Sequence, residues 1–283
     1  MREGQASGTA ERVAIERAVH QLVDRPIVFA DPLAIRMIGA DAADRLRAHP
    51  EEHDRSSPLR PFVRAIVVVR SRLAEDEVAR GVAAGVAQYV ILGAGLDTFA
   101  YRNPHPALRV FEVDHPATQA RKRERLAATG LAVPDQLTFV ACDFGRESMP
   151  AALDRSGFDR ARPAVFAWLG VVMYLEREAV METLAFIGSL PERTAVIFDY
   201  ALPPHLFGWR ARWRYRRRLE DLARRGEPWI SFFEPAALRK DLVRLGLPDI
   251  DDLSGDDINR RFLANRTDAL RAAGAARLVV ARK

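Results

Sequence analysis

The chain has 283 residues, of which 48% are hydrophobic and 29% charged, with a formal net charge of +5. This is ordinary globular composition, which excludes a disordered, collagen-like or disulfide-rich chain. The single cysteine, Cys142, rules out an internal disulfide and favours a reducing compartment. No run of about 18 apolar residues predicts a transmembrane helix, and no apolar run near the N-terminus predicts a signal peptide. We therefore expect a cytoplasmic protein without a membrane partner.

The first third of the sequence predicts a helical extension over residues 1–86. Helical periodicity starts near Thr9 and ends before Pro26. A short second helix is expected to have Asp31 as N-cap and Pro32 at its first helical position. Residues 48–61 are polar and proline-containing, which indicates a loop, and residues 61–85 predict another helix.

From residue 87 onward, short apolar runs alternate with helical patterns. Such alternation is typical of βαβ units in a doubly wound, Rossmann-like α/β sheet. We expect one domain, with a cofactor-binding core at 87–200 and a helical cap insert followed by final strands at 201–283. The predicted strands are 88–92, 109–113, 137–142, 163–168, 194–198, 249–253 and 277–281, and the predicted helices are 116–129, 176–190 and 205–245.

The first predicted strand is followed directly by Gly93, Ala94 and Gly95. Two glycines at this spacing allow a tight turn and let a ligand approach the backbone, and a following helix would present free N–H groups. Thr98 stands where the dinucleotide fingerprint has its third glycine, which favours a ligand without a pyrophosphate. A tight turn with no ligand remains the alternative.

Two further strands end in acidic residues. Asp114 lies 19 residues beyond Gly95, where a carboxylate can accept hydrogen bonds from ribose hydroxyls. Glu112 is a rival on the same strand face, and Asp114 could instead cap the next helix. After the third strand, Asp143 could accept from an adenine amino group with Phe144 against the ring, or it could be a turn residue. Three consecutive strand ends thus indicate one nucleoside-containing ligand.

These motifs resemble those of the leucine carboxyl methyltransferase-like family, which includes polyketide O-methyltransferases. The resemblance covers nearly the whole chain and implies a class I methyltransferase that uses S-adenosyl-L-methionine, with a role in secondary metabolism. The matching segments are residues 89–102, 111–116, 140–144 and 168–175, together with Thr9-Ala10, Asp31-Pro32-Leu33-Ala34 and Arg70-Ser71-Arg72.

The resemblance also implies roles at the cofactor site. Asp114 would hold the ribose, and Asp143 with Phe144 the adenine. Arg70 would pair with the cofactor carboxylate, with Arg72 as the alternative. Leu169 stands where many relatives have a glutamate, so any role of that carboxylate is absent or moved. Gly93 and Gly95 would face the methionine part, and Ala94 and Leu169 are the remaining expected cofactor-binding residues.

The expected reaction is O-methylation of a small-molecule carboxylate or hydroxyl. A carboxylate acceptor needs no base, whereas a hydroxyl benefits from one. Candidate bases near strand ends are Tyr174, His115, Tyr200 and His205. The spacing of histidines and acidic residues predicts no metal site.

The segment 209–218 is the strongest basic and aromatic cluster in the sequence. It could form a nucleic-acid patch, an anionic-substrate clamp or a membrane-surface helix. We favour an amphipathic cap helix with Trp209 and Trp213 facing inward and its arginines in water, and expect no nucleic-acid partner. The alternative function is a protein or RNA methyltransferase that uses this segment.

Overall fold

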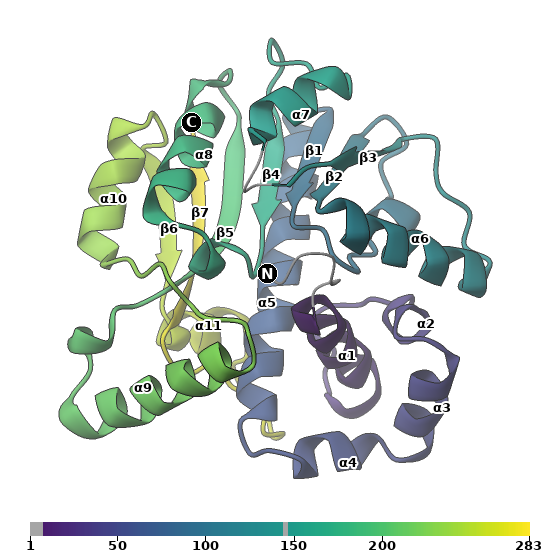
Figure 1. Ribbon diagram of the computed structural model, residues 1–283, viewed down its shortest axis with the longest axis vertical. Coiled ribbons are helices and arrows are strands. Elements are labelled where there is room, and N and C mark those ends of the chain that lie inside the picture. The colour runs from purple at the N-terminus through teal and green to yellow at the C-terminus, as the bar shows by residue number, and fades with distance from the viewer. Residues whose placement is uncertain (1–7, 144–146) are drawn as a thin grey trace.

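The computed structural model describes residues 8–143 and 147–283 and contains a seven-stranded sheet, shown in Figure 1. The strand order is β3-β2-β1-β4-β5-β7-β6, and the first five strands run parallel. This confirms the Rossmann-like α/β prediction. The parallel strands are β1 (Gln88–Leu92), β2 (Arg109–Asp114), β3 (Leu137–Ala141), β4 (Val165–Trp168) and β5 (Ala195–Ala201).

The last two strands complete the sheet, and among the described strands β7 alone runs against the direction of the others. β7 (Ala276–Arg282) runs antiparallel to both β5 and β6 (Asp249–Leu253), and lies between them. Because β7 arrives after the long C-terminal insert, that insert has both ends anchored at one side of the sheet.

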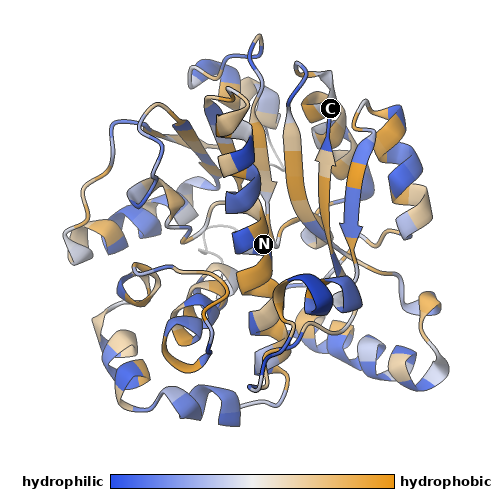
Figure 2. Cartoon of the chain, turned by 180° about the vertical axis from the view of Figure 1, so that it is seen from behind, coloured by the Kyte–Doolittle hydropathy of each residue, from blue (hydrophilic) through white to orange (hydrophobic). Residues whose placement is uncertain are grey.

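Helices cover both faces of the sheet, as the apolar strands require. Val90 and Leu92 pack against one layer, whereas Tyr89 and Ile91 pack against the other. Strands buried on both faces appear in sequence as continuous apolar runs, and Figure 2 shows them as the orange centre of the molecule. The first layer is α7 (Met149–Arg155), α8 (Arg177–Ser189) and α10 (Pro235–Arg244), and the second includes α5 (Arg60–Ala83) and α11 (Gly255–Phe262).

The N-terminal extension forms its own hydrophobic cluster with α6 (Pro116–Thr129). Its helices are α1 (Gly8–Val23), α2 (Ala34–Met37), α3 (Ala40–Ala48) and α4 (Pro50–Arg55). The loop predicted over residues 48–61 is therefore wrong in part, because α4 occupies its centre.

The predicted start of the second helix is also wrong. α2 begins at Ala34, and Leu33 occupies the N-cap position without a side-chain hydrogen bond. The carboxylate of Asp31 is fully buried and pairs with Arg17 at 2.5 Å. The same carboxylate accepts a hydrogen bond from the Leu33 N–H at 3.2 Å, so Asp31 supports the turn before α2 without being its N-cap residue.

Between β1 and β2 the chain forms only a short 3-10 turn, η1 (Phe99–Tyr101). The helix expected directly after the glycine loop is absent. The backbone N–H groups of Gly93 and Ala94 donate to the Val113 carbonyl of β2 instead, at 2.8 and 3.3 Å.

The single helix predicted over residues 205–245 is wrong, because two helices occupy this segment. α9 (Trp209–Arg224) follows η3 (Pro204–Leu206), and residues 225–234 separate it from α10. Another 3-10 turn, η2 (Val172–Tyr174), follows β4. Within 8–143 and 147–283, no helix combines the length and apolarity needed to cross a membrane.

Candidate functional site

The loop after β1 depends on the conformational freedom of its glycines. Gly93 and Gly95 have φ angles of +69° and +48°, a region that other residues enter only at a cost. A Cβ atom on Gly93 would lie 2.5 Å from Cγ2 of Val171. The turn therefore brings the loops after β1 and β4 into close contact.

Asp114, the last residue of β2, is tied directly to this loop. Its Oδ2 accepts a hydrogen bond from the Gly95 N–H at 2.6 Å, and its Oδ1 accepts from the His115 N–H at 2.7 Å. Burial raises the pKa of Asp114, although these two N–H groups act in the opposite direction. Each oxygen has a second lone pair that a ligand hydroxyl could use.

The rival carboxylate, Glu112, has a different partner. It is buried, and its Oε2 accepts a hydrogen bond from Nζ of the buried Lys122 at 2.6 Å. Burial is the main cause of the raised pKa of Glu112, which is about 7. Glu112 thus belongs to the packing between β2 and α6, and the geometry favours Asp114 for ligand contact.

Asp143 follows β3, beside the end of β2. Its Oδ2 lies 3.9 Å from Nε2 of His115, the residue after Asp114. Asp143 therefore lies beside the residue that follows Asp114. Phe144 lies outside the described residues, so its place against an adenine ring remains a prediction.

Arg70 reaches this edge of the sheet from α5. Its guanidinium is buried, and Nη1 donates to Oδ2 of Asp199 at 2.9 Å. A Cβ on Gly170 would lie 2.8 Å from Nη2 of Arg70, so the loop after β4 packs directly on the guanidinium. Arg72, the alternative, is half-exposed and pairs with Asp76 along the same helix.

Leu169 supplies no polar group, but a carboxylate is present nearby. The Leu169 side chain packs, partly buried, against the hydrophobic cluster around α5. Oδ1 of Asp199, in β5, accepts a hydrogen bond from the Gly170 N–H at 2.5 Å. Sequence reasoning missed Asp199 as a site residue, although it directly follows the predicted strand 194–198, which is the same signal that singled out Asp114.

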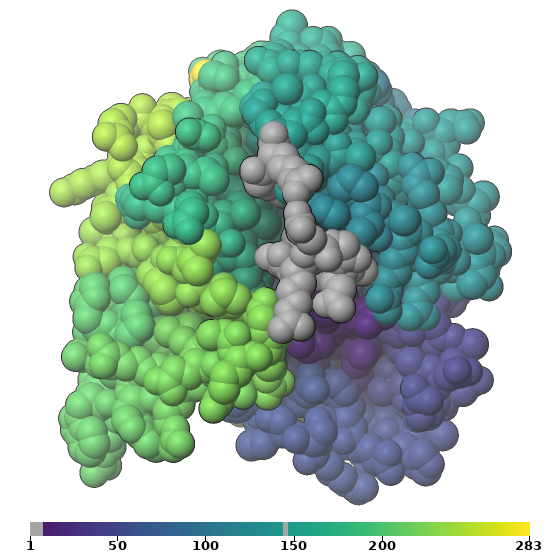
Figure 3. Space-filling view, in the orientation of Figure 1, coloured from purple at the N-terminus to yellow at the C-terminus, as the bar shows by residue number. Residues whose placement is uncertain are grey.

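The first turn of α1 forms one wall of this edge. Ala10 lies against Gly95, since a Cβ on Gly95 would be 3.0 Å from the Cβ of Ala10. Arg12 forms an ion pair with Glu227 of the C-terminal insert. Figure 3 shows part of the N-terminal helical region, in purple, near the centre of this face between the teal and the green parts of the chain. The extension and the insert thus meet beside the glycine loop.

A buried network fastens α1 to the glycine loop. Nη2 of Arg17 donates to Oγ1 of Thr98 at 2.8 Å, and the same hydroxyl donates to Oδ1 of Asp31 at 2.9 Å. Thr98, the residue that replaces the third glycine of the dinucleotide motif, therefore has a structural use that sequence reasoning missed.

The four candidate bases have different surroundings. Nδ1 of His115 accepts from the Ala117 N–H, so this ring caps α6. His205 is largely exposed and pairs with Glu234 at 2.8 Å. Tyr200 is buried in β5 and donates to Asp252 at 3.0 Å. Tyr174, in η2, is half-buried on the same loop as Gly170.

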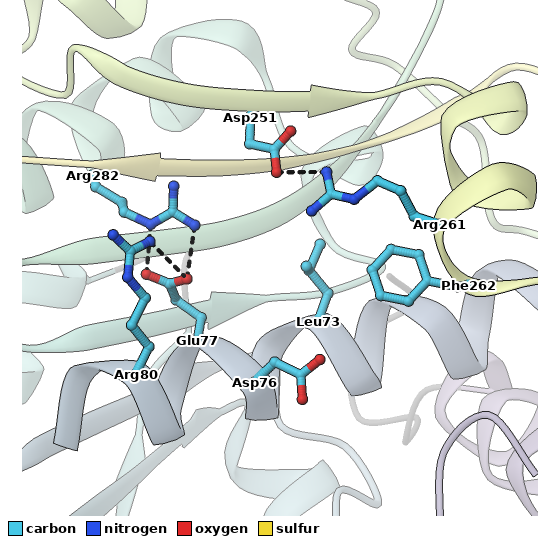
Figure 4. Close-up of a pocket in the computed structure, with 8 residues that line it drawn as sticks. All are labelled: Leu73, Asp76, Glu77, Arg80, Asp251, Arg261, Phe262 and Arg282. Carbon is cyan, nitrogen blue, oxygen red and sulfur yellow. Dashed lines mark hydrogen bonds and ion pairs between the residues drawn. The ribbon is translucent and has the colours of Figure 1, made fainter. Parts of the chain in front are cut away.

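A cavity of about 390 Å³ lies elsewhere, between α5 and the β6–β7 edge. Figure 4 shows that its charged groups face one another: Glu77 pairs with Arg282 and Arg80, and Asp251 with Arg261. It shares no residue with the strand-end cluster, so we do not assign the ligand site to it. Among the residues that the structure covers, no group of three histidine, cysteine or acidic side chains could hold a metal.

The fold and the strand-end cluster define a class I methyltransferase-type α/β protein. A sequence model of the leucine carboxyl methyltransferase family matches residues 10–188, and the chain belongs to this family. It is an S-adenosyl-L-methionine-dependent methyltransferase.

Relatives of the chain agree with this assignment. The chain is 32% identical over 299 aligned positions to the Bacillus subtilis protein named "Putative S-adenosyl-L-methionine-dependent methyltransferase YktD", covering 96% of each chain. A Mycobacteroides abscessus protein with the same description is 36% identical over 191 positions, covering 66% of this chain and 62% of that one.

Two crystal structures share the fold at low identity. A DUF574-family protein from Streptomyces avermitilis has a TM-score of 0.59 at 17% identity, covering 96% of this chain and 97% of that one. A protein titled as a methyltransferase from Thermobifida fusca has a TM-score of 0.55 at 15% identity, covering 100% and 96%.

The residues at the strand ends fit S-adenosyl-L-methionine. The half-buried Asp114 carboxylate suits a ribose diol, and the buried Arg70 suits a carboxylate because it has five N–H donors, of which Asp199 uses one. At the left-handed glycine turn, Val171 and Ala10 pack where side chains of Gly93 and Gly95 would lie, so this turn is fixed beside Asp114. Leu169 can contribute only apolar contact.

Proposed function

We propose that this methyltransferase methylates an oxygen of a small molecule, either a carboxylate or a hydroxyl. The observation that carries the proposal is that Asp114, Gly95 and the first turn of α1 at Ala10 meet at the carboxyl ends of the strands. A site walled by its own N-terminal helix and its own insert suits a small acceptor better than a large surface.

When bound, S-adenosyl-L-methionine supplies a methyl group already activated by a positively charged sulfur. The chain's own residues then bind the cofactor, orient the acceptor and exclude water from the reacting atoms. We assign the ribose to Asp114, the adenine to Asp143 and Phe144, and the amino-acid carboxylate to Arg70. We assign the methionine part to the turn formed by Gly93, Ala94 and Gly95.

The acceptor is proposed to lie beside η2. The Ile230 N–H of the insert donates to the Met173 carbonyl at 2.8 Å, so insert and loop are joined there. Tyr174 lies on this loop, whereas His115, Tyr200 and His205 are held by other partners. Tyr174 is therefore our candidate for holding or accepting the proton of a hydroxyl acceptor.

The test is an acceptor screen with matched carboxylic acids, phenols and alcohols. Formation of S-adenosylhomocysteine with a methyl ester or methyl ether would support the proposal. Tyr174→Phe should lower kcat about 100-fold for a hydroxyl acceptor, and leave a carboxylate acceptor nearly unchanged, because a carboxylate has no proton to lose.

The alternative acceptors are protein and RNA. Methyl transfer from labelled cofactor to either, with no transfer to any small molecule, would replace the proposal. The family resemblance to polyketide O-methyltransferases supports secondary metabolism as the setting, and the buried thiol of Cys142 supports the cytoplasm.

A further inference from the structure

The outer face of α9 takes no part in the cofactor site. Trp209 is 73% exposed and Trp213 is 58% exposed, so the prediction that both face inward is wrong. The two side chains are four residues apart, which places them on the same face of the helix. Instead, Ala211, Tyr215 and Leu222 occupy the inner side.

Aromatic packing explains why the tryptophans point outward. Tyr215 anchors α9 by donating to the Leu202 carbonyl at 3.2 Å and by an edge contact with Phe207 at 5.4 Å between ring centroids. Trp229 makes a second edge contact with Tyr215, with 6.5 Å between the ring centroids. These inner contacts fix the rotation of the helix, and they leave Trp209 and Trp213 largely exposed.

The formal net positive charge of the chain is concentrated on the same helix. Seven arginines and two acidic residues give α9 a formal net charge of +5, equal to that of the whole chain, so the rest of the chain is balanced. Across the described ranges, Arg210, Arg214, Arg216 and Arg217 form no ion pair with a carboxylate. Figure 1 shows α9 at the periphery of the molecule.

Arginine and tryptophan are also interleaved on this face. The guanidinium carbon of Arg210 lies 4.8 Å from the centre of the Trp209 ring, and that of Arg217 lies 4.8 Å from the Trp213 ring. Each ring thus has a cation against one face. Indole rings with flanking cations are the side chains that occupy the headgroup level of a bilayer.

We propose that the outer face of α9 docks on a membrane surface rich in anionic phospholipids. The 16-residue helix is about 24 Å long. Non-specific binding of single-stranded nucleic acid, in contrast, uses a groove with open aromatic faces. The arginines would meet lipid phosphates, and the two indoles would enter the interface. Docking would hold the enzyme beside lipid-soluble acceptors.

The test is co-sedimentation of the full chain with vesicles of phosphatidylglycerol and phosphatidylcholine, compared with phosphatidylcholine alone. We expect binding only to the anionic vesicles, and weakening by added salt. Indole fluorescence should shift to the blue, because Trp209 and Trp213 leave water, whereas Trp168 is already buried.

Two α9 variants and one control separate the contribution of the arginines to membrane binding from that of the tryptophans. Arg210→Gln/Arg214→Gln/Arg217→Gln should lower the partition coefficient about 100-fold, since each basic residue near an anionic surface contributes about five-fold. Trp209→Ala/Trp213→Ala should abolish the fluorescence shift. The control removes the same charge from exposed positions of α10, as Arg239→Gln/Lys240→Gln/Arg244→Gln, and should bind like the wild type.

Three outcomes would overturn the proposal: no binding to anionic vesicles, equal loss in the α10 control, or preferential binding of an RNA or DNA oligonucleotide that releases the protein from vesicles. Titration with S-adenosyl-L-methionine should give the same affinity for all four proteins. Since α9 is outside the cofactor site, a failure of docking leaves the methyltransferase assignment untouched.

Discussion

Asp114 owes its position to two backbone N–H groups, from Gly95 and from His115. One belongs to the turn after β1 and the other to the start of α6, so the carboxylate is fixed between two neighbouring strand ends. A side chain held this way loses little conformational freedom when it binds a ligand, which favours affinity.

Asp114→Asn should weaken binding of S-adenosyl-L-methionine about 10- to 100-fold. The amide keeps the shape of the carboxylate but loses the charge that strengthens hydrogen bonds, worth about 1.5–3 kcal/mol. Isothermal titration measures the change. Asp135→Asn, the same substitution at an exposed turn before β3, is the control, and an equal affinity for Asp114→Asn and wild type would remove Asp114 from the site.

Cys142 gives a second residue-scale prediction. It is 1% exposed, and burial raises the pKa of its thiol to about 11. The reactive thiolate forms only above the pKa, so at pH 8 about 0.1% is present, and reaction with a disulfide reagent should rise about ten-fold per pH unit up to pH 11. Fast labelling of folded protein at pH 8, at the rate of urea-unfolded protein, would contradict this environment.

At the scale of elements, α1 is attached to the sheet by charge as well as by apolar contact. Arg17 and Asp31 are both buried, and Thr98 joins their ion pair to the glycine loop. An isolated charge in such a place is costly, because no water replaces the missing partner. The network therefore couples the order of the N-terminal extension to the shape of the cofactor loop.

Asp31→Ala should lower the free energy of unfolding by about 3–5 kcal/mol, the cost of leaving one member of a buried pair alone. Urea denaturation followed by circular dichroism measures it. Asp44→Ala in α3, which removes a carboxylate from an exposed pair with Arg47, should change stability by about 0.5 kcal/mol or less. Similar losses in both variants would mean that the Arg17 network does not fasten the extension.

At the scale of the whole molecule, sequence patterns predicted the sheet well because buried parallel strands leave a local signal. All seven strands were predicted, including β6 at 249–253. The glycine loop and the acidic residue ending β2 were predicted for the same reason, since strand ends that share one edge must meet.

The contacts that depend on distant partners were not predictable. Aspartate is a residue type that often caps helices, but the carboxylate of Asp31 forms an ion pair with Arg17, 14 residues earlier. Trp209 and Trp213 follow an amphipathic pattern, yet the rotation of α9 is set by Tyr215 against Phe207 and Trp229. Asp199 gained a role only because α5 brings Arg70 beside β5.

The most direct test of the account is a crystal structure of the chain with S-adenosylhomocysteine. We expect both ribose hydroxyls within hydrogen-bonding distance of the Asp114 carboxylate, the adenine beside Asp143, and the amino-acid carboxylate at Arg70. A nucleoside bound away from Asp114, or in the cavity between α5 and the β6–β7 edge, would contradict it.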